Sequence, residues 1–280
     1  MILQRERSFL RQNFIFYLAG ILVVLGIKIY YSHADCDSLL WILAPTTHWV
    51  ELLSGIPFTY VSGTGYVNHS LRLWIAPSCS GVRFMLITAA MLIFSFVHSI
   101  TSPEEASLPK VSLRIMRGFG WIAVSIIFSW LFTVCVNGLR IITAIFLPMY
   151  LEQAGLMNGL LTADRLHTMI GVVVYFTALL MLYQLVTYFI QRKSRLFGQP
   201  DNTYHSPENS RRQSELARKC IPPVFWYFFM TVGLPLFNRA YRSGTAEFME
   251  YAVLIICCLT LILLLYCLVW LLRGRSRRKG

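Results

Sequence analysis

Charged residues are scarce in this chain. They account for 14% of its 280 residues, while apolar residues account for 56%. A soluble domain typically carries about 25% charged residues. The shortage of charge therefore argues against a soluble globular domain and favours a membrane protein.

Motifs for metal, nucleotide and disulfide chemistry are also missing. The sequence contains no CxxC, HExxH or GxxxxGK[ST] pattern, and its seven cysteines lack the paired spacing of a disulfide framework. A metal site made of His69, Cys79 and His167 would have no recognised ligand spacing. We therefore expect neither a bound metal nor a cofactor.

Acidic residues are few, 13 against 25 Lys and Arg, which gives a net charge of +12. In a soluble protein this excess would favour nucleic-acid binding. Here the basic residues cluster beside apolar runs, where the positive-inside rule explains them, and tryptophans such as Trp49 fit an interfacial aromatic belt. We expect contact with membrane lipid and no nucleic-acid partner.

Apolar runs predict about six transmembrane helices, because a helix crosses the hydrocarbon core with roughly 20 apolar residues. The first run lacks a small-residue cleavage site, so it is interpreted as a retained anchor rather than a signal peptide. The expected spans are residues 14–31, 80–100, 118–137, 168–190, 221–241 and 248–272.

The segments between these spans are expected to be interfacial. Residues 38–53 predict an interfacial or short membrane helix, and residues 141–166 an external, partly embedded segment with a turn near Gly155. In residues 58–75, the sequence Ser62-Gly63-Thr64-Gly65 separates β-prone runs and predicts a small extracytoplasmic β-hairpin. The expected fold class is an all-α integral membrane protein, a polytopic helix bundle with interfacial segments and this hairpin.

The positions of the basic residues predict sidedness. Arg5, Arg7 and Arg11 precede the first span, which places the N-terminus in the cytoplasm. Alternation of the spans then makes the C-terminus cytoplasmic and puts 18 of the 25 Lys and Arg residues on that side. We expect a multi-pass protein of the inner (plasma) membrane.

Three regions follow from this organisation. Residues 1–190 form a membrane domain that carries the candidate site, residues 191–220 a basic cytoplasmic linker expected to be a loop, and residues 221–280 a two-helix extension. No internal repeat is visible, which disfavours a transporter built from inverted repeats.

A cysteine stands at the predicted external end of the second span. Ser78 is a good N-cap, so Cys79 is expected in the first helical turn. Backbone N–H groups and the helix dipole there would lower the pKa of the thiol and stabilise an oxyanion. In the run Cys79-Ser80-Gly81, Gly81 permits close approach by a substrate, and Arg83 shares a helical face with Cys79.

Two further polar groups stand at predicted external span ends. Arg140 interrupts an apolar stretch, where a charge is costly and marks a candidate functional site; Asn137 would hold the turn that presents it. His167 has a pKa suited to proton transfer at neutral pH, and Asp164 three residues earlier would orient its imidazole.

Plainer interpretations exist for each residue. Cys79 would be a small packing residue, Arg140 an interfacial arginine that reaches the headgroups, and His167 a capping residue. Arg83 would anchor at the interface and Asp164 would be a solvated loop charge. Together, however, a nucleophile, a proton acceptor and an anion stabiliser on one face are the minimal set for cysteine-based acyl transfer.

The ordered set Cys79-Ser80-Gly81, Asn137-x-x-Arg140 and His167 on successive spans resembles the exosortase/archaeosortase family, over about residues 35–190. The resemblance implies a membrane-embedded cysteine transpeptidase or peptidase, with Cys79 as nucleophile and Arg140 and His167 as essential residues. Its partners would be exported proteins with a C-terminal sorting tail, made of a motif, a membrane helix and a basic cluster. A lipid- or glycan-linked surface acceptor would receive the cleaved protein.

The alternative is a non-enzymatic membrane assembly factor or a transporter for surface polysaccharide. This alternative requires a hydrophilic path between spans and predicts that Cys79 can be replaced without loss of function. The few intramembrane charges disfavour such a path.

Overall fold

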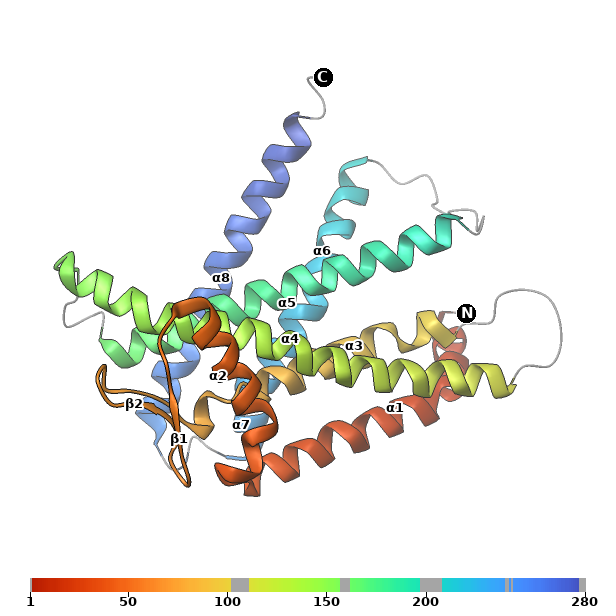
Figure 1. Ribbon diagram of the computed structural model, residues 1–280. Coiled ribbons are helices and arrows are strands. Elements are labelled where there is room, and N and C mark those ends of the chain that lie inside the picture. Colours follow the sequence, from red (N-terminus) through yellow and green to blue (C-terminus); the bar gives the residue numbers. More distant parts are fainter. Residues whose placement is uncertain are drawn as a thin grey trace. The chain divides into compact units, whose positions relative to one another are not determined.

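The computed structural model describes residues 2–101, 111–156, 162–196, 208–239, 242 and 244–276. Long helices and one small sheet make up these parts (Figure 1). Within them, six helical segments are long and apolar enough to cross a membrane, which confirms a mostly helical multi-pass membrane protein. The segments are Asn13–His33, Pro77–Thr101, Ser112–Gln153, Ala163–Arg192, Lys219–Phe237 and Thr245–Trp270.

The chain forms two compact units, Met1–Ile142 and Thr143–Gly280. The first unit contains α1 (Ile2–His33), α2 (Leu40–Ser54), the sheet, α3 (Val82–Thr101) and most of α4 (Val111–Gln153). The second contains the end of α4, then α5 (Ala163–Leu196), α6 (Glu208–Phe228), a π-helical segment (Phe229–Gly233), α7 (Leu234–Phe237) and α8 (Thr245–Ser276).

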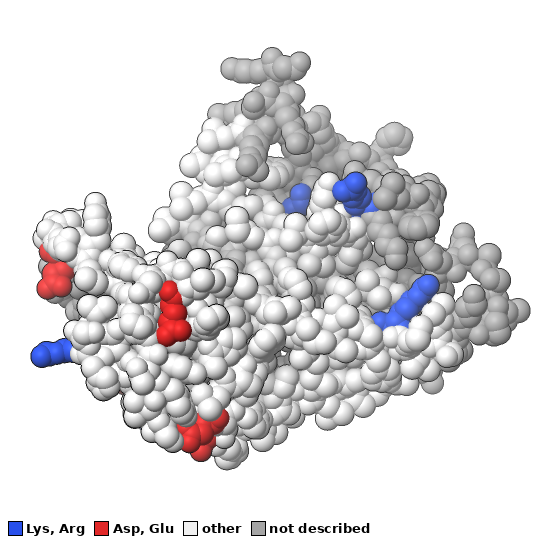
Figure 2. Space-filling model, viewed as in Figure 1, with Lys and Arg blue, Asp and Glu red and all other residues white. Residues whose placement is uncertain are grey.

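The surface suits a lipid environment. On the described part of the face in Figure 2, a few separate charged side chains lie among uncharged ones. Large apolar side chains such as Phe14, Leu22, Ile127 and Leu264 are about 60% exposed. In water this exposure would cost roughly 25 cal/mol per Å², whereas lipid tails are as apolar as the side chains themselves.

The helix α4 is longer than the sequence predicted. It runs without interruption from Val111 to Gln153, 43 residues, or about 65 Å at 1.5 Å per residue, roughly twice the hydrocarbon core. Asn137 therefore lies inside the helix and does not hold a turn there, and residues 141–153 continue the helix beyond the expected membrane exit. The predicted turn at Gly155 is confirmed, since Gly155 has a φ of 67° and the N–H of Leu156 bonds the carbonyl of Leu151 at 2.9 Å.

α3 is the central helix of the first unit. Of the 18 most apolar consecutive residues in its candidate span, 72% are buried, against 11–33% in the other five candidate spans. α1 packs along α3, and Phe16, Ile93, Val97 and Ile122 from α1, α3 and α4 form a buried apolar cluster. Small residues permit this packing, because a Cβ on Gly118 would lie 2.2 Å from the Phe16 ring.

A buried hydrogen-bond cluster joins one end of the same three helices. The carboxamide oxygen of Asn13, only 3% exposed, accepts bonds from Thr101 Oγ1 at 2.8 Å and from Arg114 Nη2 at 3.0 Å. These residues belong to α1, α3 and α4. Because a buried polar group is costly unless bonded, the cluster fixes the three helices in register.

A three-stranded antiparallel sheet follows α2, in the order β1 (Thr59–Val61), β2 (Gly65–Asn68) and β3 (Leu73–Ile75). The predicted hairpin is β1–β2, with Val61 opposite Gly65 across a three-residue loop. Residues 58–75, expected to form a single hairpin, thus form three strands, and in the third Ile75 pairs with Tyr66. The sheet leads the chain directly into Pro77–Cys79.

The hairpin tip is held by Asp37. Its carboxylate accepts hydrogen bonds from the Tyr60 hydroxyl, from Ser62 Oγ at 2.9 Å and from the Gly63 N–H at 3.3 Å. These bonds lower the pKa of Asp37, led by the one from Tyr60, and the same bond raises the pKa of Tyr60 to about 12. The charged carboxylate is therefore the form that the hairpin favours.

The second unit is built around α5, which packs against α6 and α8. α5 continues to Leu196 and α6 begins at Glu208. The region 191–220, expected as a loop, is therefore helical in its described residues. Residues 197–207, the middle of that expected loop, lie outside the described residues.

We predict that Asp37→Ala loosens the hairpin without unfolding the membrane helices. Amide hydrogen exchange of residues 59–68 should accelerate, because three donors lose their acceptor. In the unchanged protein the protection should persist at neutral pH and fade only as the pH drops below 3.8, since the pKa of Asp37 is lowered in the folded state. Asp35→Ala is the matched control, because Asp35 bonds the Ser38 N–H instead; equal acceleration in both variants would contradict the assignment.

Candidate functional site

Cys79 lies in a 3₁₀ turn, Pro77–Cys79, and not in the first turn of a helix capped by Ser78. The Cys79 N–H bonds the carbonyl of Ala76 at 2.8 Å, and Gly81, with a φ of 75°, separates the turn from α3. The expected position was wrong because Gly81 is left-handed, so that α3 begins only after it, at Val82. Cys79 therefore lies outside the first turn of the helix, to which the effect of the helix dipole is confined.

The surroundings of Cys79 differ from those of its neighbour. Cys79 is partly exposed, as an attacking thiol requires, whereas Ser80 is fully buried and its hydroxyl makes no hydrogen bond. Arg83 is exposed on the first turn of α3, and it does not share a helical face with Cys79 as expected, because Cys79 lies outside that helix. All seven cysteines of the chain are thiols, so Cys79 is not consumed by a disulfide.

One face of α4 carries a buried polar stripe. Thr133 and Asn137 are fully buried and Arg140 is 8% exposed, at the spacing of successive helical turns. The Asn137 side-chain N–H donates to the Cys79 carbonyl at 2.6 Å. Burial of Arg140 within the protein disfavours the interpretation that it extends to lipid headgroups.

The helix α2 covers α4 beside this stripe. Its buried face consists of Ile42, Leu43, Thr46, Thr47 and Val50, which follow a helical period, so the predicted short helix is confirmed. At one end of the contact, the Trp130 indole N–H donates to the Trp41 carbonyl at 3.3 Å. At the other end, a Cβ on Gly138 would lie 2.4 Å from Trp49 Cδ1.

The sequence did not single out Trp49 or Thr133 as parts of this region. Trp49 had been attributed to an interfacial belt, because aromatic residues are enriched there. Gly138 was the available signal, since a glycine in a helix interior costs about 1 kcal/mol relative to alanine and is retained where a neighbour approaches closely.

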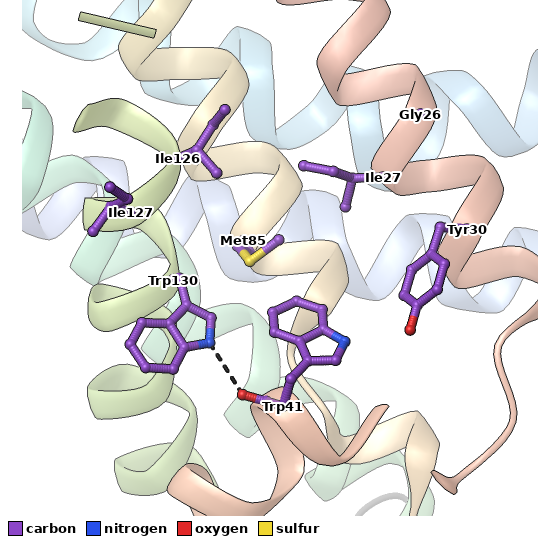
Figure 3. Close-up of a pocket in the computed structure, with 8 residues that line it drawn as sticks. All are labelled: Gly26, Ile27, Tyr30, Trp41, Met85, Ile126, Ile127 and Trp130. Carbon is purple, nitrogen blue, oxygen red and sulfur yellow. Dashed lines mark hydrogen bonds between the residues drawn. The ribbon is translucent and has the colours of Figure 1, made fainter. Parts of the chain in front are cut away.

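An apolar cavity of about 610 Å³ lies in the first unit among α1, α2, α3 and α4. In Figure 3 the side chains of Ile27, Met85 and Ile126 surround its interior, and the dashed Trp130–Trp41 bond lies at one edge. The remaining lining residues are Gly26, Tyr30, Trp41, Ile127 and Trp130. Such a lining suits hydrocarbon rather than water.

His167 belongs to the second unit, near the start of α5. The N–H of Leu166 bonds the carbonyl of Thr162 at 2.9 Å, and Asp164 lies in the first turn. His167 and Asp164 are both exposed and lie on one continuous helix, as expected. Arg165 Nε donates to Glu250 Oε1 at 2.6 Å, which joins α5 to α8.

The first unit thus joins the cysteine turn to the helix that carries Arg140. Convergence of Cys79, Arg140 and His167 stays a prediction. Among the described residues, no group of three His, Cys, Asp or Glu side chains is arranged to hold a metal ion. The chain matches no known protein-family model, no curated protein and no solved structure.

We predict that Gly138→Ala displaces α2 from α4. The new methyl group would overlap the rigid Trp49 indole, and overpacking of this kind costs about 1–3 kcal/mol. Hydrogen exchange of residues 40–54 should accelerate. Trp49→Ala in the Gly138→Ala background should restore part of the lost protection by removing the overlap. If residues 40–54 of the double variant exchange as fast as the added effects of the two single variants predict, the contact between Gly138 and Trp49 does not hold α2 on α4.

Proposed function

We propose that the protein is an exosortase-like cysteine transpeptidase or protease that cleaves the C-terminal sorting tails of exported membrane-anchored proteins. The observation that carries the proposal is the attachment of the partly exposed Cys79 turn to α4, one helical turn from the buried Arg140. A cysteine and an arginine so arranged suit attack on a carbonyl and stabilisation of the resulting oxyanion.

The first half of the proposed reaction transfers an acyl group to the cysteine. His167 takes the proton of the Cys79 thiol, and the thiolate sulfur forms a bond to the scissile carbonyl carbon. Arg140 stabilises the oxyanion through its N–H donors. The amide C–N bond then breaks, His167 gives its proton to the leaving amine, and a thioester remains on Cys79.

The second half releases the product. An acceptor, either water or a lipid- or glycan-linked nucleophile, attacks the thioester carbonyl. Its proton passes through His167 to the leaving sulfur, which regenerates the thiol. The acceptor therefore decides between hydrolysis and attachment to the cell surface.

Membrane embedding is part of this proposal. A substrate held by its own membrane helix diffuses in two dimensions and presents its motif at a fixed depth, which lowers the orientational cost of attack. In the proposed topology the active site faces the extracytoplasmic side of the plasma membrane, and both termini are cytoplasmic. The basic cluster of the substrate tail would then lie on the same side as the basic segments of the enzyme.

We predict that Cys79→Ala abolishes processing of a co-expressed tail-bearing substrate while membrane insertion is unchanged. Arg140→Lys should reduce the cleavage rate by at least ~100-fold, because it removes a preorganised oxyanion donor. Cleavage is measured from the mobility of the substrate on gels, normalised to the amount of enzyme in the membrane fraction.

Cys135→Ala is the matched control, since Cys135 lies on α4 but is exposed; it should cleave at the unchanged rate. Undiminished cleavage by Cys79→Ala would reject the proposal and favour the non-enzymatic alternative.

A further inference from the structure

The side chain of Asn137 connects the cysteine turn to α4. Asn137 is fully buried, and its amide Nδ2 donates to the carbonyl oxygen of Cys79 at 2.6 Å, across 58 residues of sequence. The bond is made to the backbone of the cysteine itself, so it acts on the position of that residue directly.

The Cys79 carbonyl stands outside the hydrogen-bond ladder of α3. The first backbone bond of that helix joins the Met85 N–H to the Gly81 carbonyl at 3.0 Å. The 3₁₀ turn itself uses the carbonyls of Ala76 and Pro77. Asn137 therefore supplies from α4 a donor to a carbonyl that neither the turn nor the helix uses in these bonds.

Gly81 makes room for this bond. A Cβ at position 81 would lie 2.9 Å from both Cγ and Nδ2 of Asn137, and 3.0 Å from Thr133 Cγ2. The distance of 2.9 Å is shorter than real Cβ contacts, the contact with Thr133 would be tight, and the φ of 75° is strained for any side chain. Gly81, which was expected to leave room for a substrate, thus leaves room for the Asn137 side chain.

From these contacts we infer that Asn137 is a positioning residue for the nucleophile: its amide, seated against Gly81, fixes the Cys79 turn on α4. Arg140 lies three residues further along the same buried face. One rigid helix then sets the position of both the thiol and the oxyanion donor. The inference deepens the proposed function and rests on it for its catalytic consequence.

Asn137→Asp tests the bond with little change of shape. An ionised carboxylate only accepts hydrogen bonds and would repel the Cys79 carbonyl. Because burial favours the protonated form, which can donate, the rates are measured across a range of pH and compared at its alkaline end. We expect kcat for tail cleavage to fall by at least ~10-fold, because misplacement of a reacting group by about 1 Å costs up to 100-fold. KM should stay within about twofold, since Asn137 is fully buried and is given no contact with the tail.

Alkylation of Cys79 gives a second measurement that needs no substrate. In a background where the other six cysteines are serine, a membrane-impermeant maleimide should react faster with Cys79 in Asn137→Asp than in the parent, because the turn is released from α4. Gly81→Ala disturbs the same contact by placing a methyl group against Asn137, and it should raise the alkylation rate of Cys79 in the same way. The double variant should resemble either single variant rather than their sum.

Leu139→Ala is the matched control, because Leu139 lies on α4 but is half exposed; both rates should remain at the parent value. Thermal unfolding of every variant is measured in parallel. Parent-like kcat and alkylation rates in both Asn137→Asp and Gly81→Ala would overturn the inference. A fall in kcat that only matches the loss of folded protein would also overturn it, since the residue would then be merely structural.

The two measurements separate the inference from the proposed function. If Cys79→Ala still cleaves, the proposed function fails whatever the alkylation rates are. If Cys79→Ala is inactive but neither Asn137→Asp nor Gly81→Ala changes either rate, the proposed function stands and the inference fails.

Discussion

The partly buried hydrogen bond between the Asn137 amide and the Cys79 carbonyl connects the Cys79 turn to the helix that carries Arg140. A neutral hydrogen bond contributes about 0.5–1.5 kcal/mol net, but an unmade buried one costs about 1–3 kcal/mol. In a low-dielectric interior the difference favours a single arrangement of the turn. The sheet, the 3₁₀ turn and α3 are therefore held at one place on α4, which also carries Arg140.

Close contacts at glycine recur throughout the first unit. Gly20 faces Ile93, Gly118 faces Phe16 and Gly138 faces Trp49, each closer than a side chain would allow. Within a bilayer, apolar burial gives little net drive for helix association, so close packing and hydrogen bonds take its place. At Gly81 the missing side chain makes room for a polar group, the Asn137 amide, in the candidate site.

The sequence predicted the spans and the hairpin well, because length, hydrophobicity and turn residues are local properties. It failed where tertiary contacts decide. Asn137 and Gly138 have low helix propensity, yet α4 continues through both, with Asn137 bonded to the Cys79 carbonyl and Gly138 packed against Trp49. Arg140 was identified from its cost in an apolar run, whereas the role of Gly81 required its contact with Asn137.

In the proposed function, Cys79 forms an acyl bond with the substrate. Mass spectrometry of the enzyme, quenched in acid during cleavage of a tail-bearing substrate, detects that bond. We expect a thioester adduct on the peptide containing Cys79 that hydroxylamine removes, and no adduct in Cys79→Ala. An adduct on another residue, together with cleavage that survives loss of Cys79, would contradict it.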